Sequence, residues 1–160
     1  MILAIDPGNK ESAFVLMDDD LKPMQFAKLQ NKVLLKEIRN YIKNCAWQID
    51  ICIEMVASYG MAVGKEVFET CVWIGRFMEV CNYMNKEVTL IYRKDEKINL
   101  CNNMKAKDSN ITQALKDRFG DKGTKKNPGW FYGFYKDVWQ AYAVGVTYHD
   151  LYLKEVQGNE

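Results

Sequence analysis

The opening stretch, MILAIDPGNKESAFVLMDDD, constrains the fold more than any other part of the sequence. Two short apolar runs, residues 2–6 and 12–17, flank a Pro-Gly turn, which is typical of two strands joined as a hairpin. The first run ends in Asp6. An Asp is common before a turn because its side chain can bond the backbone that follows. Taken alone, Asp6 is therefore explained by turn chemistry, and the alternative that stays open is that it is a member of a metal-binding carboxylate cluster.

The remainder of the chain predicts an α/β fold. The third strand of the opening meander and two later strands are predicted at residues 24–29, at the segment IDICIE (49–54) and at residues 87–92. Helical spacing of apolar residues predicts helices over residues 33–46 and 65–84 and a last helix that begins near Lys136. A further helix is predicted to end at Phe119, with Asp108, Ser109 or Asn110 as its N-cap. No repeat or linker interrupts the pattern. We therefore expect one α/β domain, residues 1–160, with a mixed sheet.

Composition narrows the class of protein. The chain has 160 residues, of which 48% are hydrophobic and 27% charged, as in ordinary soluble domains. No segment reaches the length of a membrane span, and we expect no secretory signal. The five cysteines form no C-x-x-C pair and lie mostly in apolar runs, which favours free thiols in a reducing cytoplasm over zinc or disulfides. The lone His149 argues against a histidine-ligated metal or a Ser-His-Asp triad.

The net charge of +1 conceals an uneven distribution. Residues 89–127 carry ten Lys or Arg against five Asp or Glu, whereas residues 1–30 carry three Lys against five acids. A basic later third suits contacts with phosphates. On charge alone, a solvated surface explains it equally well.

Three carboxylates lie at the ends of predicted elements. Asp6 and Glu54 each close a strand, and Asp137 lies in the first turn of the last helix. If the two strands are parallel neighbours, both acids emerge at the carboxyl edge of the sheet, where open α/β sheets place their sites. Asp137 is also favoured by the helix dipole alone. Three converging carboxylates repel one another unless a cation lies among them, which indicates Mg²⁺ or Mn²⁺.

Three motifs carry a resemblance to a known family: ILAIDPG, the apolar strand that ends in Glu54, and KDVWQAYAVGVTY. In this order they resemble the RuvC-like Holliday junction resolvases of the RNase H-like superfamily, in the versions found in phages and prophages of low-GC Gram-positive bacteria. The resemblance extends through IEMVASYGMAVGKEVFETCVWIGRF, KAKDSNITQALKDRFG and NPGWFYGFYKDVWQA, and so covers most of the chain.

The resemblance implies an RNase H-like mixed five-stranded sheet, made of an antiparallel meander plus parallel strands and flanked by helices. It also implies a Mg²⁺-dependent endodeoxyribonuclease, with Mn²⁺ able to substitute, that cleaves branched DNA such as four-way junctions in the bacterial cytoplasm. The chemistry would be two-metal phosphodiester hydrolysis.

Carried over by position, the resemblance assigns Asp6, Glu54 and Asp137 as catalytic metal ligands. The family usually has a fourth acid three residues after the third, and here that position is Gln140. Residues three apart on a helix are neighbours, so Gln140 should face the site with a neutral oxygen. Because Gln140 replaces this fourth acid, metal affinity or the occupancy of a second metal position should differ from that of the family.

DNA contacts are expected from several residues. The resemblance places Lys97 and Lys107 near lysines that approach the scissile phosphate, and an exposed lysine is the alternative for each. Tyr59, in the loop after Glu54, lies near the aromatic that the family inserts at the strand-exchange point, and it either stacks on a base or packs in the core. For phosphate contacts we also predict three loop lysines, Lys122, Lys125 and Lys126. The aromatic run 130–135 is predicted to pack and fix this loop.

Resolving a four-way junction takes two symmetric cuts, which predicts a homodimer. The helix 65–84 is the predicted interface because Trp73, Phe77 and Met84 widen its apolar face, and the alternative is that this helix is central to the core. Two rival functions remain: a non-catalytic branched-nucleic-acid-binding protein, which Gln140 favours, and a ribonuclease acting on RNA–DNA hybrids. An actin-like ATPase or sugar kinase would need a second similar half, which 160 residues do not supply.

Overall fold

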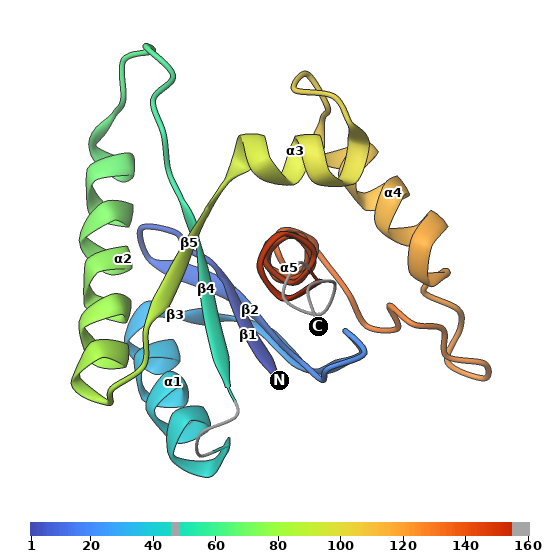
Figure 1. Cartoon of the computed structure of the whole chain (residues 1–160), viewed down its shortest axis with the longest axis horizontal. Helices are drawn as coiled ribbons and strands as arrows, with labels where there is room; N and C mark the ends of the chain where they lie inside the picture. The colour runs from blue at the N-terminus through green and yellow to red at the C-terminus, as the bar shows by residue number, and fades with distance from the viewer. Residues whose placement is uncertain (46–48, 155–160) are drawn as a thin grey trace.

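A mixed sheet of five strands lies between two layers of helices in the computed structural model, which describes residues 1–45 and 49–154 (Figure 1). The strand order is β3-β2-β1-β4-β5. The strands are β1 (Ile2–Asp6), β2 (Glu11–Met17), β3 (Pro23–Gln30), β4 (Asp50–Met55) and β5 (Val88–Tyr92). Strands β1 to β3 form an antiparallel meander, while β4 runs parallel to β1 and β5 parallel to β4. The predicted fold class is confirmed.

Six helical segments surround this sheet in the described part of the chain. They are α1 (Asn31–Cys45), α2 (Lys65–Tyr83), α3 (Arg93–Cys101), α4 (Asp108–Phe119), α5 (Val138–Tyr148) and the π-helical turn η1 (His149–Leu153). Helices α1 and α2 cover one face of the sheet, and α5 covers the other, with α3 and α4 beside it (Figure 1). The last residue of the helix predicted over 33–46 lies outside the described residues. None of the described helices is long and apolar enough to cross a membrane.

Both faces of the central strands are buried, because side chains alternate between the two faces of a strand. In β1, Leu3 and Ile5 pack toward α1 and α2, whereas Ile2 and Ala4 pack toward α5. This double burial explains why the strand is a continuous apolar run, as central strands of α/β sheets are. It also fixes which face the residue after Ile5 points to.

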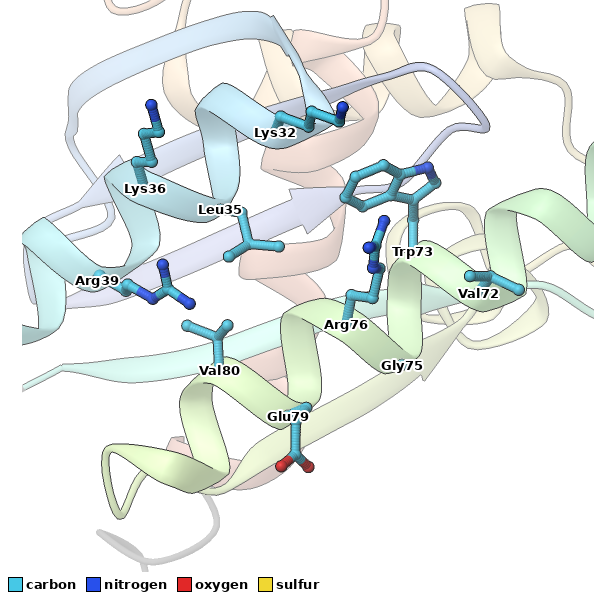
Figure 2. Close-up of a pocket in the computed structure, with 10 residues that line it drawn as sticks. All are labelled: Lys32, Leu35, Lys36, Arg39, Val72, Trp73, Gly75, Arg76, Glu79 and Val80. Carbon is cyan, nitrogen blue, oxygen red and sulfur yellow. The ribbon is translucent and has the colours of Figure 1, made fainter.

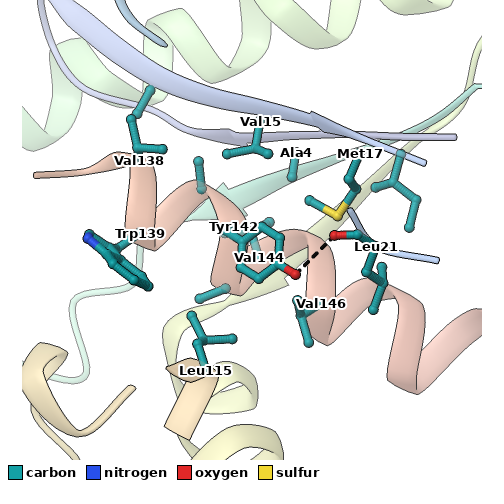
Figure 3. Packing of buried hydrophobic residues seen from close by; sticks show 14 of the residues in the cluster. Ala4, Val15, Met17, Leu21, Leu115, Val138, Trp139, Tyr142, Val144 and Val146 are labelled. Atoms are coloured by element: carbon teal, nitrogen blue, oxygen red, sulfur yellow. Dashed lines mark hydrogen bonds between the residues drawn. The ribbon is translucent and has the colours of Figure 1, made fainter. Parts of the chain in front are cut away.

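Helix α5 lies unusually close to the sheet (Figure 3). A Cβ built on Gly145 would press on Met17 Cε, the end of a flexible side chain, and would lie 3.0 Å from Ala4 Cβ, so a larger residue here would require the neighbouring side chains to shift. The hydroxyl of the buried Tyr142 donates a hydrogen bond of 3.0 Å to the Leu21 carbonyl oxygen, drawn dashed in Figure 3. These contacts hold the helix, and with it Asp137 at its start, against the sheet.

The aromatic segment before α5 packs mainly into the core. Phe131 and Phe134 are fully buried, and Trp130 stacks on Phe119 with ring centroids 5.4 Å apart. Tyr132 and Tyr135 stay nearly half exposed. The predicted packing role therefore holds for the two buried rings and for the partly buried Trp130, which together anchor the chain before α5.

On the opposite face, helix α2 presents Ile74, Phe77 and Cys81 to the sheet. Phe77 is 0% exposed, so the prediction that it contributes to an interface is wrong: its ring is part of the core of one chain. Met84 is likewise partly buried against this core. The exposed apolar residues of the helix are instead Phe68, Val72 and Tyr83.

Candidate active site

The acidic site begins with two neighbouring strand ends. β1 and β4 are parallel with Ile5 opposite Ile53, so Asp6 and Glu54 follow in register at the carboxyl edge of the sheet. Because Ile5 and Ile53 both face α1 and α2, alternation turns the next two side chains toward α5. The two carboxyl groups are partly buried and share a hydrogen bond. The sequence-based expectation that both acids emerge at one edge is confirmed.

The turn after Asp6 is held by a small polar network. Ser12 Oγ accepts a hydrogen bond from the Gly8 amide (3.1 Å) and donates one to Asn31 Oδ1 (2.6 Å). Asn31 Nδ2 in turn donates to the Gly8 carbonyl oxygen at 2.8 Å. Ser12 and Asn31 are both buried, so the network fixes the turn and the end of β1 from inside the protein.

Electrostatics at this edge disfavour several negative charges. Burial raises the pKa of Asp6 to about 9, and the charge of Glu54, the hydrogen bond to it and the charge of Asp137 add to the shift. Burial also raises the pKa of Glu54, which the positive charge of Arg93 opposes. In the absence of another cation, the pair therefore holds a proton between its two carboxyl groups.

Asp137 reaches the site from the start of α5, where it is the N-cap residue. Its Oδ2 lies 2.5 Å from Lys28 Nζ, which comes from β3, and this bond raises the pKa of Lys28. The Tyr135 hydroxyl accepts a hydrogen bond from the Lys28 amide at 3.1 Å. The third predicted acid is thus near Asp6 but paired with a lysine.

Two charged residues that the sequence did not point to act electrostatically on the acidic pair. Arg93 and Glu96 lie in α3, which starts directly after β5, and Arg93 Nη1 donates to Glu96 Oε2 at 2.6 Å. A second nitrogen of Arg93 donates to Asp108. Burial raises the pKa of Glu96 well above its usual range; the charge of Glu54 adds to this, Arg93 opposes it, and Asp6 adds further.

The oxygen atoms of the three acids and of Gln140 are of the kind that bind a hard divalent cation. The three acids do not, however, form a set of ligands in this structure. Over residues 1–45 and 49–154, no three His, Cys, Asp or Glu side chains form a cluster that could hold a metal ion. Asp137 points to Lys28 instead. However, Gln140 Oε1, one turn after Asp137, is buried without a hydrogen-bond partner. Carboxylates that repel one another beside an unpaired amide oxygen suit Mg²⁺ or Mn²⁺.

A small basic pocket is lined in part by Arg93, whose charge acts on Asp6 and Glu54. It has a volume of about 270 Å³ and is lined by Tyr59, Arg93, Lys94, Lys97 and Met104. Tyr59 is 56% exposed, so the alternative that it packs in the core is wrong. Two predicted DNA contacts, Tyr59 and Lys97, therefore come together on one surface with two further cations.

The other predicted lysines are exposed. Lys107 precedes α4, and its amide donates to Asn110 Oδ1 at 2.9 Å. The loop that carries the last three predicted lysines is closed by a bridge between Gly123 and Pro128. These exposed lysines are Lys122, Lys125 and Lys126. None of the four lines the basic pocket.

A larger groove of about 620 Å³ lies between α1 and α2, on the far face of the sheet from α5 (Figure 2). Figure 2 shows the cations Lys32, Lys36 and Arg39 on α1 opposite Trp73 and Arg76 on α2. The Arg76 guanidinium lies 4.5 Å from the centre of the Trp73 ring. The groove contains none of the three predicted acids and is a surface separate from the acidic site.

An antiparallel meander joined to two parallel strands, with helices on both faces of the sheet, is the RNase H-like class of fold. Among solved structures, the chain is similar to T. thermophilus RuvC in complex with a Holliday junction substrate, with a TM-score of 0.72 and 12% identity over 97% of this chain and 95% of that one. A second structure, of Thermus thermophilus RuvC, has a TM-score of 0.66 and 14% identity, over 97% of this chain and 96% of that one. The fold is therefore that of the RuvC-like resolvases.

The fowlpox virus resolvase in complex with Holliday junction DNA is also similar, with a TM-score of 0.53 and 13% identity over 94% of this chain and 99% of that one. No protein-family model matches the sequence, and a sequence search finds no curated relative. The likeness is therefore one of fold and not of sequence.

Proposed function

We propose that this chain is a divalent-metal-dependent endonuclease that cleaves branched DNA, with four-way junctions as its substrate. The observation that carries the proposal is the hydrogen-bonded pair of Asp6 and Glu54 at the carboxyl edge of a RuvC-like sheet, with Asp137 nearby on α5. Two of the similar structures are complexes with Holliday junction DNA, which supports this choice of substrate.

Asp6, Glu54 and Asp137 are the residues that would hold Mg²⁺ or Mn²⁺. When bound, such ions activate water and stabilise charge on the leaving oxygen of a phosphodiester. Fixed β-strand ends position two of the acids, and the packing of α5 on the sheet positions the third. Lys28 pairs with Asp137 in this structure, and Asp137 would have to leave Lys28 in order to bind a metal ion.

The basic pocket would bind the DNA near the cut. Its exposed Tyr59 offers a ring for an unpaired base, while Lys94 and Lys97 supply charges for phosphates. Lys107 and the loop lysines Lys122, Lys125 and Lys126 would add contacts that give affinity without reading sequence. The five cysteines are free thiols in the structure, which suits the cytoplasm of a bacterial cell.

Two symmetric cuts call for two copies, and the exposed stripe of α2 is the proposed interface. It consists of Phe68, Val72, Gly75, Arg76, Glu79 and Tyr83. Gly75 lies in mid-helix, where glycine costs about 1 kcal/mol relative to alanine, and a Cβ there would meet nothing within 4 Å in its own chain. Close approach of a second helix would explain this glycine. Arg76 and Glu79 could then pair across a twofold axis.

A non-catalytic binder of branched nucleic acid is the second candidate, since the three acids do not form a metal cluster among the described residues and Gln140 is neutral. A nuclease for RNA–DNA hybrids is the third. One assay separates them: labelled four-way junction, linear duplex and RNA–DNA hybrid are each incubated with the protein in Mg²⁺, Mn²⁺ or EDTA. The proposal predicts metal-dependent cleavage of the junction. Binding without cleavage supports the second candidate, and preferential cleavage of the hybrid supports the third.

A further inference from the structure

Three buried side-chain atoms have no hydrogen-bond partner in the part of the chain that the structure describes. They are Glu96 Oε1, Gln140 Oε1 and Thr147 Oγ1. Buried polar atoms are nearly always paired, so an unpaired one often marks the place of an ion, water or ligand. Two of the three lie on helices that start near the acidic site: Glu96 is in α3, and Gln140 is in α5, one turn after Asp137.

Glu96 is the more unusual of the two. Its side chain is 0% exposed, and Arg93 fixes Oε2 at 2.6 Å while Oε1 has no partner. Glu54 lies opposite Ile91 near the end of β5, and α3 starts directly after that strand, so Glu96 lies one turn into a helix that begins at the same sheet edge. The charges of Glu54 and Asp6 act on it there. A buried carboxylate is costly unless its charge is fully compensated. One arginine, shared with Asp108, satisfies only one of its two oxygens.

We propose that Glu96 is a fourth carboxylate ligand of the divalent-metal site, supplying from α3 the negative charge that Gln140 does not supply from α5. The inference rests on the proposed function, since it assigns a further ligand to the same site. Arg93 is then a positioning residue, because it holds Oε2 and leaves Oε1 free for the ion.

The alternative role for Glu96 is an ion pair that only orders α3. Asp108 offers a matched control because it bonds the same guanidinium while its side chain is 72% exposed. Replacing either acid removes one partner of Arg93. The charge of Asp108 also acts on Glu54, but from a mostly exposed side chain, whereas Glu96 is fully buried and the charges of both Glu54 and Asp6 act on it.

The test is calorimetric titration of Mn²⁺ into the full chain without DNA, together with the melting temperature in EDTA and in Mn²⁺. Glu96→Gln should weaken Mn²⁺ binding at least tenfold or remove one bound equivalent, and should lose most of the metal-induced rise in melting temperature. Asp108→Asn should bind Mn²⁺ like the wild type. If Glu96→Gln does not fold, Glu96→Asp, which withdraws the charge by one methylene, should weaken binding in the same assay.

A rescue sharpens the result. Adding Gln140→Asp to Glu96→Gln should recover most of the lost affinity, because a carboxylate returns to the site from the opposite helix. Wild-type Mn²⁺ affinity in both Glu96 variants would overturn the inference, and if Asp6→Asn abolishes binding at the same time, the proposed metal site itself stands. Failure of the wild type to bind Mn²⁺ would overturn both.

Discussion

The ammonium of Lys28 lies 2.5 Å from a carboxylate oxygen of Asp137, so the acid at the start of α5 is paired with a cation supplied by the protein. The pair joins the edge strand β3 to the helix that carries the site. Any metal that uses Asp137 therefore competes with Lys28 for it.

This competition predicts tighter metal binding when the lysine is removed. Partly exposed ion pairs contribute up to about 1 kcal/mol, so Lys28→Met should lower the Mg²⁺ concentration for half-saturation by up to about fivefold. Calorimetric titration measures the effect, with Lys22→Met, an exposed lysine before β3, as the control. Unchanged or weaker binding in Lys28→Met would show that the lysine does not compete.

The raised pKa of Asp6 predicts how stability depends on pH without divalent metal. The folded protein holds a proton on Asp6 up to about pH 9, whereas the unfolded chain releases it near 3.8. Stability from this group is therefore greatest below pH 3.8 and is lost as pH rises toward 9, by at most about 1.4 kcal/mol per pH unit. Asp6→Asn removes the titration and should reduce the slope.

Chemical denaturation in EDTA at several pH values measures these slopes. Asp121→Asn, whose side chain is 86% exposed, is the control and should keep the wild-type slope. If the free energy of unfolding falls with pH at the same slope in the wild type and in Asp6→Asn, the assignment of a buried proton to Asp6 is contradicted.

Tyr59 predicts a specific loss of junction binding. Stacking on an unpaired base is worth about 1–3 kcal/mol, so Tyr59→Ala should weaken junction binding by about five- to 150-fold and leave binding to linear duplex unchanged. Tyr132→Ala removes a tyrosine that is 45% exposed and lies outside the basic pocket, so it serves as the control. Equal loss on junction and duplex would assign Tyr59 a general role instead.

The two faces of α2 predict opposite outcomes for two glutamate substitutions. Val72→Glu, at a position 61% exposed, should give a folded monomer because it places a charge in the proposed interface. Phe77→Glu should unfold the chain because Phe77 is fully buried against the sheet. Sedimentation with circular dichroism distinguishes these cases. A folded Val72→Glu dimer would move the interface away from this stripe.

Much of the fold was predictable because its signals are local. The first strand, predicted at residues 2–6, has those bounds in the structure, and the helix predicted to end at Phe119 does so, although its N-cap is Lys107 and not one of residues 108–110. In both segments the apolar residues have the spacing typical of the element, and turn or capping residues mark the ends. The convergence of Asp6 and Glu54 followed from one further assumption, that their strands are parallel neighbours.

Helix α3 was missed because its sequence, RKDEKINLC, has almost no apolar stripe, and its one fully buried side chain is an acid. The available signals were at its ends: Asp95 accepts a hydrogen bond from the Tyr92 amide, and Asn102 adopts the left-handed conformation at the C-cap. Glu96 was missed with it, since a buried charge inside a basic segment resembles a surface residue until the fold is known. Likewise, no local pattern relates Lys28 to Asp137, which is 109 residues away.

The three acids are expected to act together on DNA, and junction cleavage by their isosteric variants tests this most directly. Labelled four-way junction is incubated in Mg²⁺ with the wild type, Asp6→Asn, Glu54→Gln or Asp137→Asn, and binding is measured in parallel in EDTA. We predict cleavage by the wild type, a loss of at least about a hundredfold in rate for each variant, since each removes a charged group that would hold the ion, and junction affinity close to that of the wild type. Cleavage at the wild-type rate by Asp6→Asn or Glu54→Gln would contradict the account.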